Sequence, residues 1–190
     1  MAVITISRQA GSLGDEVAQQ VASRLGYRMV EREVINHAAR RAGAPEVALA
    51  MIDELNLLGF CPSEEACQAY IHTLQVVMEE LAAGGNIVIV GRAGQVILSD
   101  CPDTIHVRLI APAEIRTARI AERQKIPLHA AHAQMTASDR YRRNFLKRFY
   151  NRKLDDPDQY DLIINTARLT FEAAVDVICQ AVPHSFSKLS

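Results

Sequence analysis

The chain has 190 residues, 49% hydrophobic and 23% charged, and this ordinary globular composition predicts a single domain over residues 1–190. With 21 Lys and Arg against 22 Asp and Glu, its net charge of −1 argues against a general nucleic-acid or membrane-surface binder. We expect no signal peptide, and no apolar run reaches the roughly eighteen residues that span a bilayer. The four cysteines lack the CxxC pairing of a zinc site and the density of a disulfide scaffold, so we expect reduced thiols in a cytoplasmic protein.

Short β-branched runs alternate with helical stretches along the chain, a pattern typical of a parallel sheet with helices on both faces. The region 45–83 is predicted to be helical, and its 64–82 part carries one apolar stripe at three- and four-residue spacing. The 64–82 helix is expected to pack on the core, whereas for residues 45–67 core packing and contact with a partner both stay open. Strands are expected at 2–6, 28–30, 87–90, 105–110 and 161–164, and helices near 15–25, 31–42, 64–82, 113–124, 129–152 and 171–181.

A small-residue loop lies between the first strand and the first helix, in the segment from Ser7 to Glu16. The backbone N–H groups of such a loop, with the positive end of the helix that follows, favour an anion. The loop departs from the GxxxxGK[ST] pattern of a Walker A motif: Arg8 stands at the first Gly, Leu13 at the last Gly and Gly14 at the Lys. A tight turn with no ligand is the competing interpretation.

Two carboxylates, Asp15 and Glu16, occupy the first turn of that helix, where they favour the helix dipole and repel a phosphate. An activity that uses this loop therefore requires both carboxylates to point away from the phosphates and Leu13 not to obstruct them; if these conditions fail, the fold remains without that activity. We expect Arg8 to supply the missing cation, and Ser7 or Ser12 to supply the hydroxyl.

Further arginines lie in later segments of the chain, where they could also bind phosphate. Arg92 lies in Gly91-Arg92-Ala93-Gly94, directly after the strand at 87–90, at the edge where parallel sheets bind ligands and where a guanidinium can grip a phosphate. Arg116, Arg119 and Arg123 share adjoining faces of one helix. A basic stretch runs from Arg140 to Lys153, although such a run is more often a solvated face.

Taken together, these segments resemble nucleoside monophosphate kinases of the cytidylate kinase type, and most closely the divergent cytidylate kinase-like family. The resemblance covers residues 4–18, 27–35, 87–98, 105–123, 139–143 and 160–175. It implies an α/β, P-loop kinase-like three-layer fold with a five-stranded parallel sheet flanked by helices and an arginine-rich helical lid at 129–152. It also makes 45–83 the substrate-side region.

The resemblance further implies phosphoryl transfer from ATP with Mg²⁺ to a nucleoside monophosphate, CMP first among the acceptors. Arg92 matches the residue that holds the acceptor phosphate, and Arg32 is a candidate for a second contact. Ala93 stands where ordinary cytidylate kinases carry an acidic residue near the metal. The lid arginines that act on the transferred group are Arg119, Arg142 and Arg143, and the ATP-binding loop comprises Ser7, Arg8, Gly11, Ser12 and Gly14.

Three alternatives stay open. The same fold would also serve a catalytically silent nucleotide or phosphate sensor, or a protein that docks a partner through 45–83. RNA binding by the basic stretch 140–153 is disfavoured by the near-neutral charge. The apolar helices over 47–81 also suggest a homodimer. The sequence predicts no protein-bound metal site, because His129 and His132 share a helix face without a third ligand.

Overall fold

The computed structural model describes residues 2–31, 35–36, 40–41, 43 and 63–182. All of the expected strands are present, within two residues of their expected ends, and form one sheet of five parallel strands in the order β2-β3-β1-β4-β5. The strands are β1 (Val3–Arg8), β2 (Arg28–Val30), β3 (Ile87–Val90), β4 (Thr104–Ile110) and β5 (Leu162–Asn165).

The expected helices within the described residues are also confirmed. Most of the helix expected at 31–42, and all of the 45–62 part of the predicted helical region 45–83, lie outside those residues. A single-turn helix, α5 (Gly94–Ile97), and a 3-10 turn, η1 (Pro157–Gln159), were not predicted, since elements this short carry no periodic signal. The longer helices are α1 (Gly14–Leu25), α4 (Glu64–Ala83), α6 (Ala113–Gln124), α7 (Leu128–Tyr150) and α8 (Phe171–Ala181).

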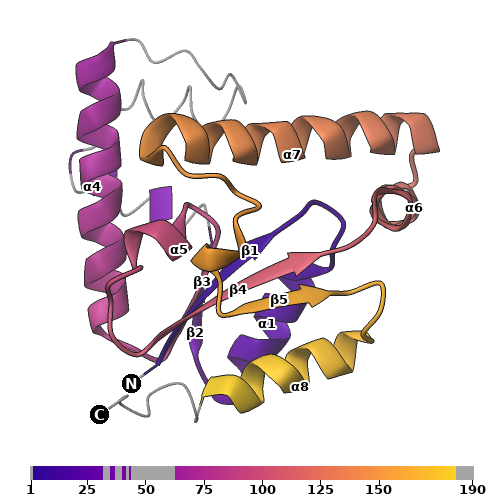
Figure 1. The fold of residues 1–190 in the computed structure, drawn as a ribbon, viewed down its shortest axis with the longest axis horizontal. Coiled ribbons are helices and arrows are strands. Elements are labelled where there is room, and N and C mark those ends of the chain that lie inside the picture. The colour runs from indigo at the N-terminus through magenta and orange to yellow at the C-terminus, as the bar shows by residue number, and fades with distance from the viewer. Residues whose placement is uncertain (1, 32–34, 37–39, 42, 44–62, 183–190) are drawn as a thin grey trace.

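The helices cover the two faces of the sheet and make a three-layer fold (Figure 1). Successive side chains of a strand point to opposite faces, so β3 divides its residues between two cores. Val88 and Val90 pack with α1 and α8, whereas Ile87 and Ile89 pack with α4, α5 and the end of α7. Because both faces are covered, every residue of β3 is buried, which explains its uninterrupted apolar sequence.

The apolar stripe of α4 faces the core of its own chain. Tyr70, Leu74 and Met78 are fully buried there, together with Ile87 and Ile89 of β3. The described half of the apolar 47–81 region is therefore largely used in folding the monomer. A homodimer through this region stays a prediction.

The connections of β1 indicate the edge of the sheet at which a ligand is expected to bind. β1 lies between β3 and β4, and the chain leaves it towards β2 on one side and later enters β4 on the other. Ligands of open α/β sheets bind outside the carboxyl ends of the strands at such a reversal. The loops after β1 and β3 lie at this edge, and α7 extends past it (Figure 1).

The sequence analysis also made expectations about the cysteines and about membrane-spanning segments. Cys101 and Cys179 are free thiols, as expected. Cys67 is disulfide-bonded, so the expectation of reduced thiols is wrong at this position. A search of the described residues finds no helix with the length and apolarity required to cross a bilayer.

Candidate functional site

A cavity of about 900 Å³ opens between the carboxyl ends of β1 and β3 and the side of α7. Its wall includes Ser7 and Arg8 from β1, Arg92 from the turn after β3, and Arg140 and Arg142 from α7. Four guanidinium groups from three separate elements thus border one cavity. We call it the main cavity.

The turn that carries Arg92 has an unusual backbone. Gly91, Arg92 and Ala93 have φ angles of 81°, 53° and 58°, so three successive residues are left-handed, two of them with a Cβ. Such conformations cost free energy for a non-glycine residue and cluster at functional sites. Here they bury the Arg92 side chain, which is 8% exposed, in the wall of the main cavity.

Arg8 crosses the β1–α1 loop and is held by it. A Cβ at Gly14 would lie 2.3 Å from the Cβ of Arg8, and a Cβ at Gly91 would lie 2.6 Å from an Arg8 Nη atom. The two glycines therefore make the space through which Arg8 passes. Its Nε donates a 2.8 Å hydrogen bond to Asp15, which lines the main cavity. Asp15 therefore faces this site, although an activity at the loop was expected to require that it point away.

A second, smaller cavity of about 200 Å³ lies between the β1–α1 loop and α6 and is lined by Gly11, Leu13, Gly14 and Arg119. Asp15 lines both cavities and joins them. Leu13 adopts a left-handed φ of 60° as the residue before α1, a conformation that suits the glycine it replaces. Leu13 borders this smaller cavity, as do the carboxylate residues Glu16 and Glu122, and is absent from the wall of the main one.

Arg119 is anchored from both sides. It donates to the carbonyl of Gly11 at 3.4 Å, and to the hydroxyl and carbonyl of Thr166 at 3.0 and 2.8 Å. The same Thr166 hydroxyl donates to the Ser12 carbonyl at 2.9 Å. Arg119 therefore ties the loop to the turn after β5.

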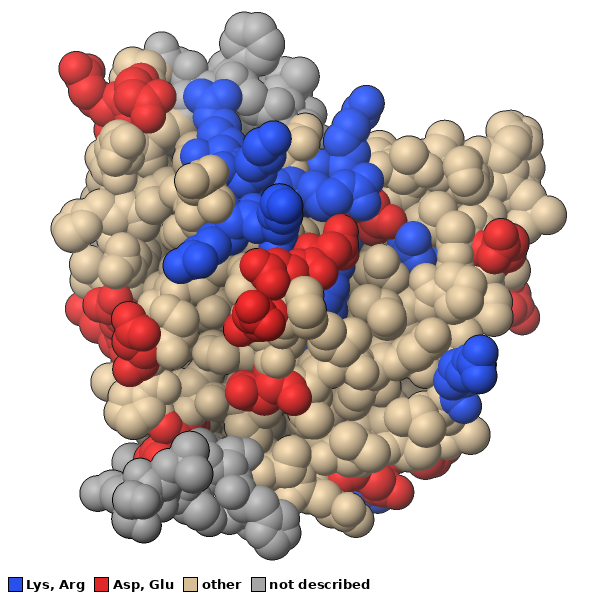
Figure 2. All heavy atoms as spheres, in the orientation of Figure 1, with Lys and Arg blue, Asp and Glu red and all other residues tan. Residues whose placement is uncertain are grey.

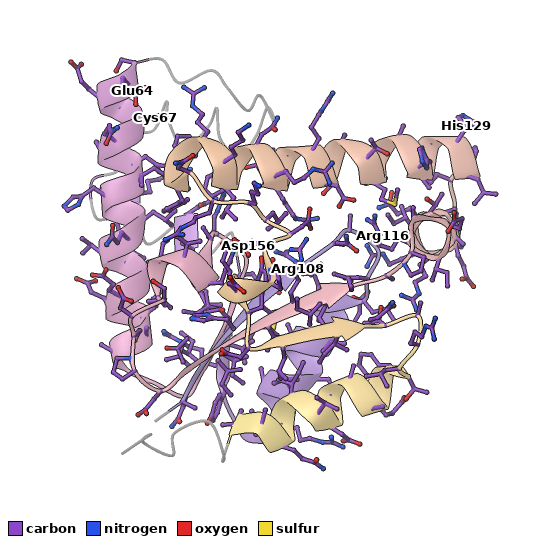
Figure 3. All side chains as sticks on the ribbon, in the orientation of Figure 1. Glu64, Cys67, Arg108, Arg116, His129 and Asp156 are labelled. Atoms are coloured by element: carbon purple, nitrogen blue, oxygen red, sulfur yellow. The ribbon has the colours of Figure 1, made fainter. Side chains whose placement is uncertain are left out.

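The remaining arginines of α6 hold the loop rather than the main cavity. Arg116 is buried, donates to the Ala10 carbonyl at 3.1 Å and forms a 2.9 Å ion pair with Asp139 of α7 (Figure 3). Arg123 pairs with Glu16 at 2.7 Å, which draws that carboxylate towards α6. The loop, α6 and α7 thus form one connected unit.

Arg108, in the middle of β4, is a buried cation that the sequence analysis missed. It is 3% exposed, donates to the Ser7 hydroxyl at 3.0 Å and pairs with Asp155 at 2.5 Å. Its guanidinium carbon lies 5.5 Å from the centre of the Tyr160 ring. A charged residue between the apolar strand residues Val107 and Leu109 was the available signal, because buried charges require partners.

The hydroxyls expected to serve a ligand differ in their surroundings. Ser7 lines the main cavity and accepts from Arg108. Ser12 is fully buried, and its hydroxyl donates to the Gln9 carbonyl at 2.8 Å. Only Ser7 of the two presents its side chain at the main cavity.

Arg142 is buried close to other positive charges. Burial, and next the charge of Arg8, lower the pKa of its guanidinium to about 10, and Arg108 acts in the same direction. One of its terminal nitrogens, Nη1, is buried and finds no hydrogen-bond partner among the residues that the structure describes. A buried, unsatisfied guanidinium nitrogen at the edge of a cavity calls for an anion.

The predicted residues thus fall into separate places. Ser7, Arg8, Arg92 and Arg142 meet at the main cavity, and Gly11, Gly14 and Arg119 at the smaller one. Arg143 is exposed and borders a third hollow. Arg32 lies outside the described residues.

A family model and a curated relative each match most of the chain. The family model for the cytidylate kinase-like family matches residues 3–168. A cytidylate kinase from Ignicoccus hospitalis is 30% identical over 178 residues, covering 94% of this chain and 97% of that protein. A uronate isomerase from Corynebacterium glutamicum is 28% identical over 110 residues, which cover 58% of this chain and only 21% of that longer protein.

Solved structures share the fold. An uncharacterised protein from Eubacterium ventriosum superposes with a TM-score of 0.76 at 22% identity, covering 96% of this chain and 98% of that one. A shikimate kinase from Acinetobacter baumannii superposes with a TM-score of 0.55 at 18% identity, covering 100% and 96%. The architecture is therefore that of the P-loop kinases, and the chain belongs to the cytidylate kinase-like family.

Proposed function

We propose that this protein is a nucleotide kinase that transfers a phosphoryl group from ATP to a nucleoside monophosphate, with CMP as the first acceptor to test. The observation that carries the proposal is the gathering of Arg8, Arg92 and Arg142 around one cavity, with a buried Arg142 nitrogen that has no partner among the described residues. Phosphoryl transfer depends on positioning and on neutralising charge spread over the phosphate oxygens. The surplus of cations here suits that task.

Each element takes one role in this proposal. The small cavity, with Gly11 and Gly14 in the loop and Arg119 opposite, receives the donor phosphates, while the buried Ser12 supports the loop through its hydrogen bond to the Gln9 carbonyl. Arg92 holds the acceptor phosphate, and Arg8 and Arg142 face the group in transit. α7 is the lid, whose closure would exclude water and so suppress hydrolysis of ATP.

The roles of Arg143 and Arg32 are less direct in this proposal. Arg143 borders a separate hollow, so in this proposal it acts on the transferred group only if α7 turns. Arg32 remains a proposed acceptor contact. The cytoplasmic location also stays a prediction.

The main cavity offers few protein ligands for Mg²⁺. Among the described residues, no group of three or more His, Cys, Asp or Glu side chains is arranged to hold a metal. Mg²⁺ in phosphoryl transfer needs only one or two carboxylates besides phosphate oxygens and water. Asp15 and the Ser7 hydroxyl line the main cavity and are the residues that would hold it. When bound, the ion would neutralise phosphate charge.

A second candidate function is a nucleotide- or phosphate-binding protein without catalysis. Two observations favour it. The ion pair with Asp15 already neutralises the charge of Arg8 at the loop, and Ala93 offers the main cavity no carboxylate for a metal. Binding needs only the arginines, whereas transfer also needs a metal held in place.

Calorimetric titration of ATP, ADP and the four common nucleoside monophosphates, followed by an assay of ADP formation with Mg²⁺, separates these functions. The kinase proposal expects turnover with at least one monophosphate. Binding without turnover across the panel would leave the silent binder, and absence of binding would contradict both. Arg92→Gln should weaken monophosphate binding by about tenfold or more, because a charge-assisted contact is lost. The exposed Arg28, at the opposite end of the sheet, supplies the matched control Arg28→Gln.

A further inference from the structure

A hollow of about 500 Å³ lies beside the main cavity, at the carboxyl end of α7 and the segment that follows it. Leu154 lies in the wall of both spaces, so the hollow adjoins the main cavity. Figure 2 shows a group of basic side chains over this part of the molecule, with carboxylates directly beneath. The hollow is lined by Arg143, Lys147, Arg152, Lys153, Asp155 and Asp156 together with Leu154.

No described residue of the protein neutralises the four cations of the hollow. All four are exposed, and within the described residues none forms an ion pair, although five other arginines do. Asp155 pairs with the buried Arg108, and Asp156 accepts from the backbone N–H of Asp158 at the start of η1. Within the described part of the chain, the hollow thus presents four cations and one carboxylate, Asp156, that forms no ion pair.

Helix stability explains only part of this charge. Lys147 lies in the last turn of α7, where a cation favours the helix dipole. Arg152 and Lys153 lie beyond the helix and Arg143 lies two turns before its end, so the dipole accounts for none of these three. Like charges gathered around a concave surface repel one another unless an anion joins them.

The segment that carries these cations is fixed in place. The side-chain amide of Gln159 donates to the Lys153 carbonyl at 2.5 Å, and the Tyr160 hydroxyl donates to the Leu154 carbonyl at 2.9 Å. Arg108 holds Asp155 from below. A held backbone reduces the entropy lost when Arg152 and Lys153 bind a ligand.

We infer that this hollow is a second phosphate-binding subsite, which receives a further phosphate group of an acceptor whose first phosphate lies in the main cavity. The acceptor class is thus a nucleotide with two separate phosphate groups, such as a nucleoside 3′,5′-bisphosphate. The inference about the acceptor rests on the proposed function, whereas the phosphate site itself rests on the hollow's own cations.

The test compares a nucleoside 3′,5′-bisphosphate with the matching 5′-monophosphate by calorimetry at low salt. The bisphosphate should bind about tenfold more tightly, the gain of one or two charge-assisted contacts. The double variant Arg152→Gln, Lys153→Gln should abolish this advantage and leave monophosphate affinity within about twofold, whereas Arg28→Gln should preserve it. Equal affinities in the native protein, or an advantage that survives the double variant, would overturn the acceptor assignment.

Inorganic pyrophosphate tests the hollow without any nucleotide. In ¹H–¹⁵N spectra the amide signals of Arg152 and Lys153 should shift on titration, both in the native protein and in Arg92→Gln. Absence of a shift would overturn the subsite whatever the nucleotides do, while failure of monophosphates to shift the Gly91–Ala93 signals would contradict the proposed function alone. Displacement of pyrophosphate by a ten-nucleotide single strand that binds more tightly than the bisphosphate would make the hollow a nucleic-acid surface and the acceptor assignment wrong.

Discussion

Asp15, the second residue of α1, accepts a 2.8 Å hydrogen bond from the Nε of Arg8, the last residue of β1. The pair spans the β1–α1 loop and lies in the wall of the main cavity. Arg8 thus stands where a loop cation is needed, with its charge already matched by a carboxylate. A phosphate that binds here competes with Asp15 for Arg8.

Replacement of Asp15 by asparagine should reveal this competition. Without Mg²⁺, Asp15→Asn should bind ATP severalfold more tightly, because a repelling charge is removed and Arg8 is released. With Mg²⁺, turnover should fall, because the carboxylate beside the phosphates is lost. Calorimetry with and without the metal, paired with an ADP assay, measures both effects.

Asp176→Asn provides the control for that experiment, since Asp176 pairs with Arg24 away from the cavities. It should change neither ATP affinity nor turnover. If Asp15→Asn bound ATP more weakly without the metal, Asp15 would not compete with the phosphate.

Arg142 should make the free protein less stable while it strengthens ligand binding. Burial, and then Arg8, lower the pKa of its guanidinium to about 10. The pKa lies below its ordinary value in the folded state, so the penalty is present in full below pH 10 and diminishes only as the pH rises above it. At pH 7, Arg142→Met should therefore raise the free energy of unfolding by about 1 kcal/mol and weaken nucleotide binding.

Urea denaturation and calorimetry at pH 7 measure the two effects of Arg142→Met. The exposed Arg28→Met should change neither by a measurable amount. Loss of stability in Arg142→Met would show that the guanidinium is satisfied in the folded protein.

Alanine substitutions at two glycines with left-handed backbones should distinguish the cost of backbone strain from the cost of a steric clash. Gly26 has a φ of 66° and open space around an added Cβ, so Gly26→Ala should cost about 1 kcal/mol of unfolding free energy. Gly11 has a φ of 78°, and its Cβ would lie 2.6 Å from the carbonyl oxygen of Arg116. Gly11→Ala should therefore cost about 3 kcal/mol. Equal costs in urea denaturation would mean that the loop moves away from α6 freely.

The Arg108–Asp155 ion pair should respond unequally to loss of its two members. Arg108→Met leaves Asp155, whose side chain is 59% exposed, to be solvated by water. Asp155→Ala leaves a 3% exposed guanidinium with the Ser7 hydroxyl and the Tyr160 ring. We expect losses of about 1 kcal/mol for Arg108→Met and about 3 kcal/mol for Asp155→Ala in urea denaturation. The reverse order would mean that water reaches Arg108 in the folded protein.

Local sequence predicted most of the sheet and the helices. Runs such as Ile87–Val90 are apolar and β-branched over a strand's length, so only a strand buried on both faces suits them. Arg8 and Arg92 could be placed at the ligand edge because each follows or ends a predicted parallel strand, and such ends meet at one edge. Neither inference requires knowledge of distant contacts.

The partners of the arginines were decided by the tertiary structure alone. Arg108 and Asp155 are 47 residues apart, and Arg119 meets Thr166 at the same separation, so no local pattern shows either contact. Arg142 and Arg143 are neighbours in sequence, but successive residues of a helix differ by about 100° in direction. Packing of α7 therefore turned Arg142 to the main cavity and Arg143 to the hollow beside it. The sequence by itself determined the sheet, its ligand edge and the supply of cations there, because these depend on local pattern, whereas the rotation and packing of each helix selected which cations meet a ligand.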